Sequence, residues 1–198
     1  MKALLLSGGL DSVSLAYWLK PSIAITVNYG QNCADAEIRA SKTICKKLCI
    51  DHHVINVNLK EIGSGDLSEK VVSKSGPKSD WWPYRNQLLI TIVSTYILSN
   101  NLSVNEIIFG TLKSDGYHAD GKESFFKSMN ELLKIQEGDI QVSTPAIHLT
   151  CIELIKTSMI QSSLLGWSHS CHKSNYACGN CRGCFKQQNV FNELGWIL

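Results

Sequence analysis

The sequence predicts a doubly wound α/β fold, in which a parallel sheet carries helices on both faces, followed by a small zinc-binding region. Short apolar segments alternate with longer segments of helical periodicity along most of the chain. The apolar segments are almost continuous, which is typical of strands buried on both faces of a parallel sheet. After residue 166 the composition changes, and cysteine, histidine and asparagine become frequent. We therefore expect an α/β domain over residues 1–166 and a metal-binding region over residues 167–198.

The first part of the chain contains three strand candidates and two helix candidates. The strand candidates are rich in aliphatic and β-branched residues, whereas the helix candidates place apolar residues three or four positions apart. Strands are predicted over residues 2–6, 23–27 and 53–57, and helices over residues 11–19 and 34–48. A polar segment rich in Gly, Ser and Lys, residues 63–83, is predicted to be a loop, and loops of this length often act as functional lids.

The second part continues the alternation. Residues 86–98 form the most apolar helix candidate, which we expect to be buried, and a strand candidate over residues 106–109 ends at Gly110. The remaining candidates are an amphipathic helix at 122–135, a short strand at 140–143 and a final helix at 150–165. Because ligands of open parallel sheets bind beyond the carboxyl ends of the strands, we expect the site where the first strand ends.

The bulk composition excludes several classes of protein. Charged side chains make up 18% of the 198 residues and the net charge is +2, which is too small an excess to indicate nucleic-acid binding. No apolar run approaches the ~18 residues that span a bilayer, and the apolar run at the N-terminus is shorter than the ~7 residues of a signal-peptide core. We expect a cytoplasmic protein without a membrane segment.

The turn after the first predicted strand, Ser-Gly-Gly-Leu-Asp-Ser at residues 7–12, is predicted to bind phosphate. We expect both glycines to adopt dihedral angles closed to other residues and to leave room for an anion near the backbone. Amides at the start of the following helix would face that anion, and the hydroxyls of Ser7 and Ser12 would add donors. Asp11 beside a phosphate requires a divalent cation, for which Mg²⁺ is the usual choice. The turn fits neither the Walker sequence nor the dinucleotide fingerprint.

Four of the eight cysteines crowd into fourteen residues, whereas the others are scattered. In a chain of this size without a signal peptide, such a cluster indicates a metal site rather than disulfides. Four thiolates complete a tetrahedral zinc site without an open position, so the metal is expected to be structural. The predicted ligands are Cys171, Cys178, Cys181 and Cys184. The neighbouring His169 and His172 are interpreted as bystanders, and the spacing favours an iron–sulfur cluster less than zinc.

The turn at residues 7–12 resembles the pyrophosphate loop of the N-type ATP pyrophosphatases, which cleave ATP between its α and β phosphates. Together with the four cysteines, it is similar to the 7-cyano-7-deazaguanine synthase family of queuosine biosynthesis. Further similar segments follow in the family's order, at residues 28–31, 82–86, 144–150 and 167–168. The resemblance covers nearly the whole chain and implies a fold like that of the adenine nucleotide alpha hydrolases.

The resemblance also implies an activity. A carboxylate on 7-deazaguanine attacks the α-phosphorus of ATP to give an acyl-adenylate, and ammonia displaces AMP to give the amide. A second ATP activates the amide oxygen, and loss of AMP leaves the nitrile. The implied cofactors are ATP, Mg²⁺ and Zn²⁺, the implied partners are small molecules, and the likeness implies a homodimer.

The functional residues implied by the resemblance fall into three groups besides the zinc ligands. Asp11, acting with Mg²⁺, and Arg85, as a clamp for phosphate or carboxylate, are the implied catalytic residues. The implied ATP-binding residues are Leu6, Ser7, Gly8, Gly9, Leu10, Asp11, Ser12, Arg85, Asn86 and Gly110. The implied substrate-binding residues are Tyr29, Gln31, Asp115, Tyr117 and Asp120.

Three departures from the family pattern concern positive charge and the substrate loop. Cys151 stands where the family has a lysine, and Gln187 stands where it has an arginine. The segment 110–122 lacks the Pro, Cys and Arg of the family's substrate loop, and Lys113 and Lys122 are hypothesised to supply the missing charge.

These departures keep other functions open. The chain could adenylate a different acceptor, such as another carboxylate, a nucleic-acid base or a protein. It could also be a regulatory protein that binds nucleotide without turnover. A zinc-ribbon nucleic-acid binder is disfavoured, because the C-terminal region carries few cations.

Overall fold

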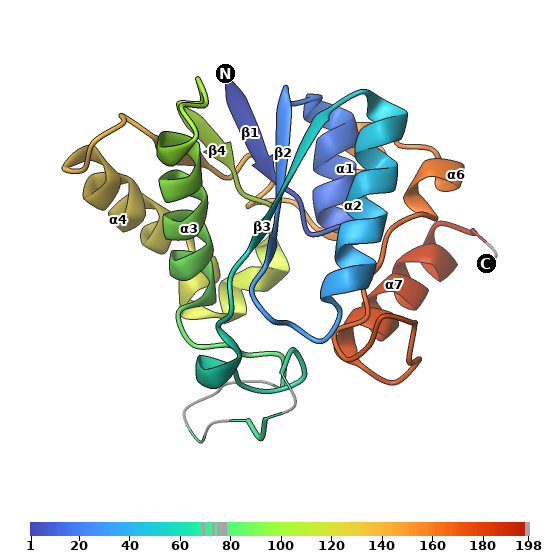
Figure 1. The fold of residues 1–198 in the computed structure, drawn as a ribbon. Coiled ribbons are helices and arrows are strands. Elements are labelled where there is room, and N and C mark those ends of the chain that lie inside the picture. Colours follow the sequence, from blue (N-terminus) through green and yellow to red (C-terminus); the bar gives the residue numbers. More distant parts are fainter. Residues whose placement is uncertain (69, 73, 75–78, 197–198) are drawn as a thin grey trace.

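A parallel sheet forms the centre of the protein (Figure 1). The computed structural model describes residues 1–68, 70–72, 74 and 79–196, and within them five strands pair in the order β3-β2-β1-β4-β5. Every pairing is parallel, and the central strand β1 pairs with β2 through Ala3 and Ile23 and with β4 through Ala3 and Ile107. The strands are β1 (Lys2–Leu5), β2 (Ile23–Asn28), β3 (Asp51–Asn56), β4 (Glu106–Ile108) and β5 (Gln141–Ser143). The predicted α/β fold with a parallel sheet is therefore confirmed.

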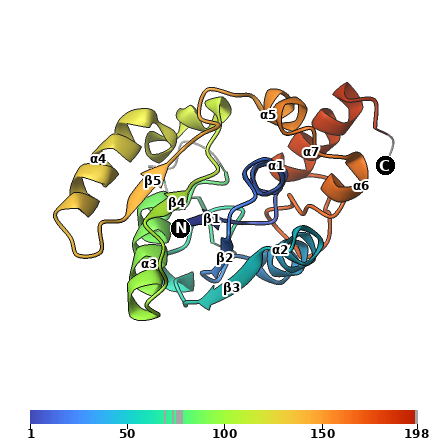
Figure 2. The same cartoon turned by 90° about the horizontal axis from the view of Figure 1, so that it is seen from above.

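Helices cover both faces of this sheet (Figure 2). Successive residues of β1 point to opposite faces, so Ala3 belongs to one apolar cluster and Leu4 to the other. On the face of Ala3 lie α3 (Arg85–Ser99) and α4 (Glu123–Lys134). On the face of Leu4 lie α1 (Leu10–Leu19), α2 (Ala34–Leu48), α5 (Cys151–Ser158), α6 (Ser162–Leu165) and α7 (Arg182–Glu193).

The direction in which the chain adds strands reverses at β1. From β1 the chain builds outward through β2 to β3, and it then returns to the other side of β1 to add β4 and β5. Such a switch point opens a crevice beyond the carboxyl ends of the two strands beside it. The crevice here is bordered by the turn after β1 and by the segment after β4, which holds the short 3₁₀ turns η2 (Lys113–Tyr117) and η3 (Ala119–Gly121).

The helix predicted over residues 150–165 is two helices, so this prediction is wrong. Helix α5 ends at Ser158, and Met159 takes the left-handed conformation with a φ of 55°. The Ser158 hydroxyl donates to the carbonyl of Ile155 and accepts from the amide of Ile160, which turns the chain and buries Ile160. The break therefore comes from burial of Ile160 rather than from a glycine or proline.

The region after residue 167 contains a helix that the sequence pattern did not predict. Helix α7 buries Val190 and Phe191 in the same apolar cluster as α1, α2 and α5. Few of its residues are apolar, so the segment is polar on average. The C-terminal region thus packs directly against the face of the sheet that carries α1.

The predicted loop at residues 63–83 is described in part. It follows the 3₁₀ turn η1 (Lys60–Ile62), contains an isolated bridge between Gly65 and Lys70, and ends in Trp82, which is buried against Tyr29 with ring centroids 5.0 Å apart. Positions 69, 73 and 75–78 of the predicted lid lie outside the described residues. Among the described helices, none combines the length and the hydrophobicity needed to cross a membrane.

The two glycines after β1 differ, although the sequence predicts unusual dihedral angles for both. Gly8 has a φ of 76°, and a Cβ there would lie 2.8 Å from the Glu37 carbonyl oxygen and 2.9 Å from the Cβ of Ala40. Gly9 is the N-cap of α1 with an ordinary φ of −77°, and a Cβ there would meet nothing closer than 3.6 Å. The expectation of unusual dihedral angles is therefore wrong for Gly9. Helix α2 approaches closely only at Gly8, which is the glycine with the left-handed backbone.

We predict that Gly8→Ala lowers the free energy of unfolding by about 2–4 kcal/mol, since it combines a left-handed backbone with a clash against α2. The matched variant Gly9→Ala should cost less than about 1 kcal/mol, because alanine fits there and is only a poorer N-cap. Urea unfolding of both variants measures the difference. Equal destabilisation would contradict the assigned role of Gly8.

Candidate active site

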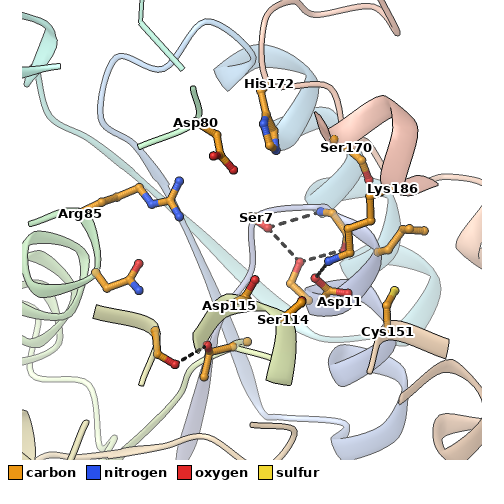
Figure 3. Close-up of a pocket in the computed structure, with 18 of the residues that line it drawn as sticks. Ser7, Asp11, Asp80, Arg85, Ser114, Asp115, Cys151, Ser170, His172 and Lys186 are labelled. Atoms are coloured by element: carbon orange, nitrogen blue, oxygen red, sulfur yellow. Dashed lines mark hydrogen bonds and ion pairs between the residues drawn. The ribbon is translucent and has the colours of Figure 1, made fainter. Parts of the chain in front are cut away.

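A cavity of about 610 Å³ occupies the crevice beyond β1 and β4 (Figure 3). Its walls come from the turn after β1, the start of α3, the 3₁₀ turns after β4, the start of α5 and the C-terminal region. The predicted ATP- and substrate-binding residues that line it are Leu6, Ser7, Gly9, Leu10, Asp11, Ser12, Tyr29, Arg85, Asn86, Gly110, Asp115, Tyr117 and Asp120. Gly8 and Gln31 are not among the described lining residues.

The turn at residues 7–12 presents hydrogen-bond donors to the cavity. The hydroxyls of Ser7 and Ser12 lie 3.1 Å apart, and the Gly9 amide donates to the Ser7 hydroxyl at 3.4 Å. Helix α1 begins without a side-chain cap, so the amides of its first turn remain available to an anion. The amide of His169 donates to the Gly8 carbonyl at 2.8 Å, which ties the C-terminal region to this turn.

Asp11 offers a carboxylate oxygen suited to a cation. Its Oδ2 accepts from the Lys186 ammonium at 2.5 Å, whereas no described residue partners its buried Oδ1. Asp115 lies close enough for the Asp11 charge to raise its pKa, in addition to the larger increase caused by burial. A pair of carboxylates with a free oxygen fits Mg²⁺, so Asp11 and Asp115 are the residues that could hold it.

Arg85 lies across the cavity from Asp11, at the start of α3 (Figure 3). Burial by itself lowers the pKa of Arg85, but nearby Tyr29 and Asp120 raise it overall, so the guanidinium stays charged. The same end of α3 is fixed to the substrate-side loop, because the Asn86 amide side chain donates to the Asp120 carbonyl at 2.8 Å. This side of the cavity therefore combines a fixed cation with acidic and aromatic groups.

Gln31 serves the turn after β2 rather than the cavity. Its side-chain oxygen accepts from the Tyr29 amide at 2.9 Å, and its amide donates to the Val27 carbonyl at 3.1 Å and to Glu37 at 2.7 Å. Gln31 is also buried. Glu37, which the sequence analysis did not select, lines the cavity instead, and burial raises the pKa of its carboxyl group.

Several residues of the C-terminal region line the cavity, although the sequence analysis assigned them no part in catalysis. Lys186 pairs with Asp11, and Arg182 pairs with Asp80 at 2.5 Å. Burial lowers the pKa of Lys186, but the neighbouring Asp11 carboxylate more than offsets this and raises it overall. Arg182 and Lys186 are four residues apart on α7 and so share a helix face. This spacing is the feature of the sequence from which a pair of cations on one side of the region could have been predicted. The hypothesised Lys113 and Lys122 are exposed and are not among the described lining residues.

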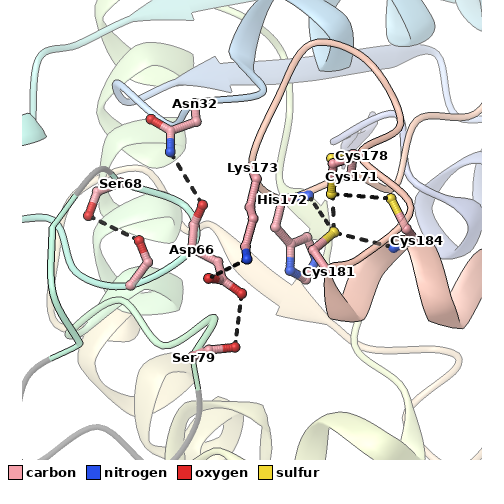
Figure 4. A network of polar contacts seen from close by, with 11 residues as sticks. Asn32, Asp66, Ser68, Ser79, Cys171, His172, Lys173, Cys178, Cys181 and Cys184 are labelled. Atoms are coloured by element: carbon pink, nitrogen blue, oxygen red, sulfur yellow. Dashed lines mark hydrogen bonds and ion pairs between the residues drawn. The ribbon is translucent and has the colours of Figure 1, made fainter.

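The four predicted zinc ligands lie together at the start of α7 (Figure 4). All four sulfurs lie within 4.8 Å of one another, and two pairs are separated by 3.9 Å, close to the ~3.8 Å that tetrahedral zinc–thiolate geometry gives. The Cys181 sulfur accepts from the amides of His172 and Cys184 at 3.4 Å each. All eight cysteines, each in the described part of the chain, are free of disulfides. The donor set therefore fits zinc.

The glycine between the last two ligands allows the metal-binding segments to pack closely. A Cβ on Gly183 would lie 1.7 Å from the Ser170 carbonyl oxygen. His169 and His172 flank Cys171 but do not belong to the group of potential metal ligands found among the described residues. The ring of His169 instead bonds the Ser174 carbonyl at 3.0 Å, in keeping with its interpretation as a bystander.

We predict that the purified protein contains about one zinc ion per chain, and that Cys181→Ser loses it and lowers the melting temperature by about 5 °C or more. Cys49→Ser, at an exposed position outside the cluster, is the matched control and should keep the metal. Elemental analysis and thermal unfolding measure both effects. Full zinc content in Cys181→Ser would show that the cluster has been misinterpreted.

Known proteins resemble this chain over nearly its whole length. The family model described as queuosine biosynthesis protein QueC matches residues 2–195. The 7-cyano-7-deazaguanine synthase of Methanococcus maripaludis is 28% identical, with 98% of this chain and 96% of the relative covered. The enzyme of that name from Methanosphaera stadtmanae is 30% identical, with 95% of this chain and 92% of the relative covered. The one from Methanocaldococcus jannaschii is 29% identical, with 98% of this chain and 96% of the relative covered. A solved deacetylase–bog complex from teicoplanin biosynthesis reaches a TM-score of 0.38 at 11% identity, which is too low to support an argument. The match over residues 2–195 shows that the chain belongs to the queuosine biosynthesis protein QueC family.

Proposed function

We propose that this protein is a 7-cyano-7-deazaguanine synthase, which converts 7-carboxy-7-deazaguanine and ammonia into the nitrile with consumption of ATP. The observation that carries the proposal is the cavity itself. The turn at residues 7–12, Arg85 and the segment after β4 all line this one cavity. Helix α1, which follows the turn, begins without a side-chain cap. Family membership and the names of the relatives support the same activity.

In this proposal, the turn after β1 binds the pyrophosphate part of ATP. The hydroxyls of Ser7 and Ser12 and the amides of the first turn of α1 stabilise the negative charge that develops on the leaving pyrophosphate. Asp11 and Asp115 would hold Mg²⁺, which supplies charge neutralisation between the phosphates when bound. These groups belong to the turn after β1, to the first turn of α1 and to the 3₁₀ turn η2, which together border one side of the cavity.

The opposite wall holds the substrate. Arg85 orients the carboxylate so that its oxygen lies in line with the α-phosphorus, because a planar guanidinium suits either a carboxylate or a phosphate. Attack forms the acyl-adenylate and releases pyrophosphate, and ammonia then displaces AMP to give the amide. The amide oxygen then attacks the α-phosphorus of a second ATP and releases a second pyrophosphate, and loss of AMP together with the two protons of the amide nitrogen leaves the nitrile. Asp120 and Tyr117, at the mouth after β4, contact the deazapurine.

A second candidate function is adenylation of a different acceptor by the same phosphate site. It is favoured by residues 110–122, which lack the Pro, Cys and Arg of the family's substrate loop and form two 3₁₀ turns around Asp115 and Asp120. In that case the phosphate half of the cavity would act as described, and the deazapurine would not be the substrate.

We predict that the purified chain, incubated with Mg-ATP, ammonium and 7-carboxy-7-deazaguanine, forms a nitrile that mass spectrometry detects. Asp11→Asn should lower the rate by about 100-fold or more, because the carboxylate charge is lost while the shape is kept. Asp139→Asn changes an exposed carboxylate outside the lining residues and should retain the wild-type rate.

The release of labelled AMP from α-labelled ATP distinguishes the two candidates. AMP release that depends on 7-carboxy-7-deazaguanine supports the synthase. ATP binding without AMP release on that acid, with release on another carboxylate, would instead support the second candidate. A wild-type protein that binds no Mg-ATP would overturn both.

A further inference from the structure

We propose that Lys186, a residue of the helix that begins at the four-cysteine cluster, binds the pyrophosphate part of ATP. This inference rests on the proposed function and assigns a phosphate ligand outside the loop that follows β1. It also gives the cluster a purpose in the active site, since the cluster positions this lysine.

Lys186 reaches the phosphate loop from the far end of the chain. Its ammonium lies 2.5 Å from Oδ2 of Asp11, across a sequence separation of 175 residues. The close-up shows the side chain running from α7 into the cavity, beside Asp11 and near Ser7 (Figure 3). The ammonium is thus placed at the loop where the pyrophosphate part of ATP is expected.

The charges around the cavity favour this assignment. The acidic lining residues are Asp11, Glu37, Asp80, Asp115 and Asp120. The lining arginines are engaged elsewhere, since Arg182 pairs with Asp80 and Arg85 lies on the opposite wall. Among the lining residues that the structure describes, Lys186 is the single lysine. A triphosphate entering so acidic a site needs a cation beside the loop, and Lys186 is the one in place.

The ion pair with Asp11 is compatible with this role. Asp11 and Lys186 offset each other's charge while they face one another, and Oδ1 of Asp11 has no partner among the described residues. Phosphate oxygens can take over the hydrogen bonds of the ammonium, and a divalent cation can take over the carboxylate. Both groups therefore keep partners of opposite charge when nucleotide enters.

Lys186 is held in place from both ends of its helix. Cys181 is the N-cap of α7, and its sulfur accepts from the Cys184 amide two residues before Lys186. At the other end, Val190 and Phe191 are buried in the apolar cluster that also contains α1. A zinc ion on the four sulfurs would fix the first turn of α7, and therefore the base of the lysine side chain.

Cys151 lines the same cavity as Lys186 and occupies the position at which the family resemblance implies a lysine. It begins α5 and is 8% exposed. Burial raises the pKa of its thiol, so this side chain stays neutral and offers a phosphate no charge. Lys113 and Lys122, the other candidates for a replacement, are exposed outside the lining.

The test is calorimetric titration of the zinc-containing protein with Mg-ATP, Mg-pyrophosphate and AMP. We predict that Lys186→Ala weakens binding of Mg-ATP and pyrophosphate by about 10- to 100-fold, the range of a lost charge-assisted hydrogen bond, and changes AMP binding little. Lys186→Arg should restore much of the affinity, since it keeps the charge. The matched control Lys122→Ala should stay within about twofold of wild type for all three ligands.

A double variant tests whether the position or the charge matters. Because Cys151 lies close to Asp11 and Lys186 in the cavity, Cys151→Lys combined with Lys186→Ala should recover affinity for Mg-ATP and pyrophosphate.

A second variant tests the part played by the four cysteines. Cys184→Ser should weaken the binding of Mg-ATP and pyrophosphate, as Lys186→Ala does, because the first turn of α7 is no longer held by zinc. Zinc content and melting temperature, measured for each variant, identify those that fold.

The outcomes separate this inference from the proposed function. Wild-type binding of Mg-ATP with unchanged affinity in folded Lys186→Ala would overturn the role of Lys186 and leave the proposed function standing. An equal loss for AMP and pyrophosphate would also overturn it, because it would indicate a structural counter-ion of Asp11. Absence of Mg-ATP binding by the wild type would overturn the proposed function and this inference together.

Discussion

The close approach of three segments at Gly8 is the constraint on which the rest of the site depends. Helix α2 lies against its Cα, so that even a methyl group would collide with the backbone of Glu37. The amide of His169 binds its carbonyl oxygen from the other side, and the backbone itself is left-handed. The turn after β1 is therefore fixed relative to the sheet, α2 and the C-terminal region at once. The direction of the amides at the start of α1 follows from that placement.

The cavity is acidic, yet the ligands proposed for it are anions. The cations of the cavity wall lie on two separate helices, with Arg85 at the start of α3 and Arg182 and Lys186 on α7. In the close-up, Arg85 and Lys186 lie on opposite sides of the cavity (Figure 3). Cations on opposite sides suit a nucleotide whose phosphates lie at one end and a carboxylate substrate at the other. A divalent cation between the phosphates and the acids would complete the balance.

The sequence predicted the sheet well, because its strands are continuous apolar runs whose burial on two faces leaves little choice of position. The four cysteines predicted as zinc ligands do lie together, and most of the predicted binding residues line the cavity, because these residues occur in short segments with strong local spacing. The break at Met159 escaped prediction because no glycine or proline marks that position, and helix α7 escaped it because few of its residues are apolar. Lys186 escaped it because its partner is 175 residues away, and only the packing of α7 brings the two together. Gln31 was selected because residues 28–31 resemble the family's segment after the second strand, but its side-chain amide bonds the backbone of that turn instead.

The packing of α7 has a consequence for how this protein can be divided. A change of composition marks off the last thirty or so residues, and such a boundary usually invites removal or exchange of a module. Here Ser170, Arg182 and Lys186 form one wall of the same hollow whose opposite wall comes from α3. A chain cut at the compositional boundary would keep its sheet but leave the hollow open on one side, and a foreign tail would have to reproduce that wall. The two parts therefore build one cavity and have to be engineered together.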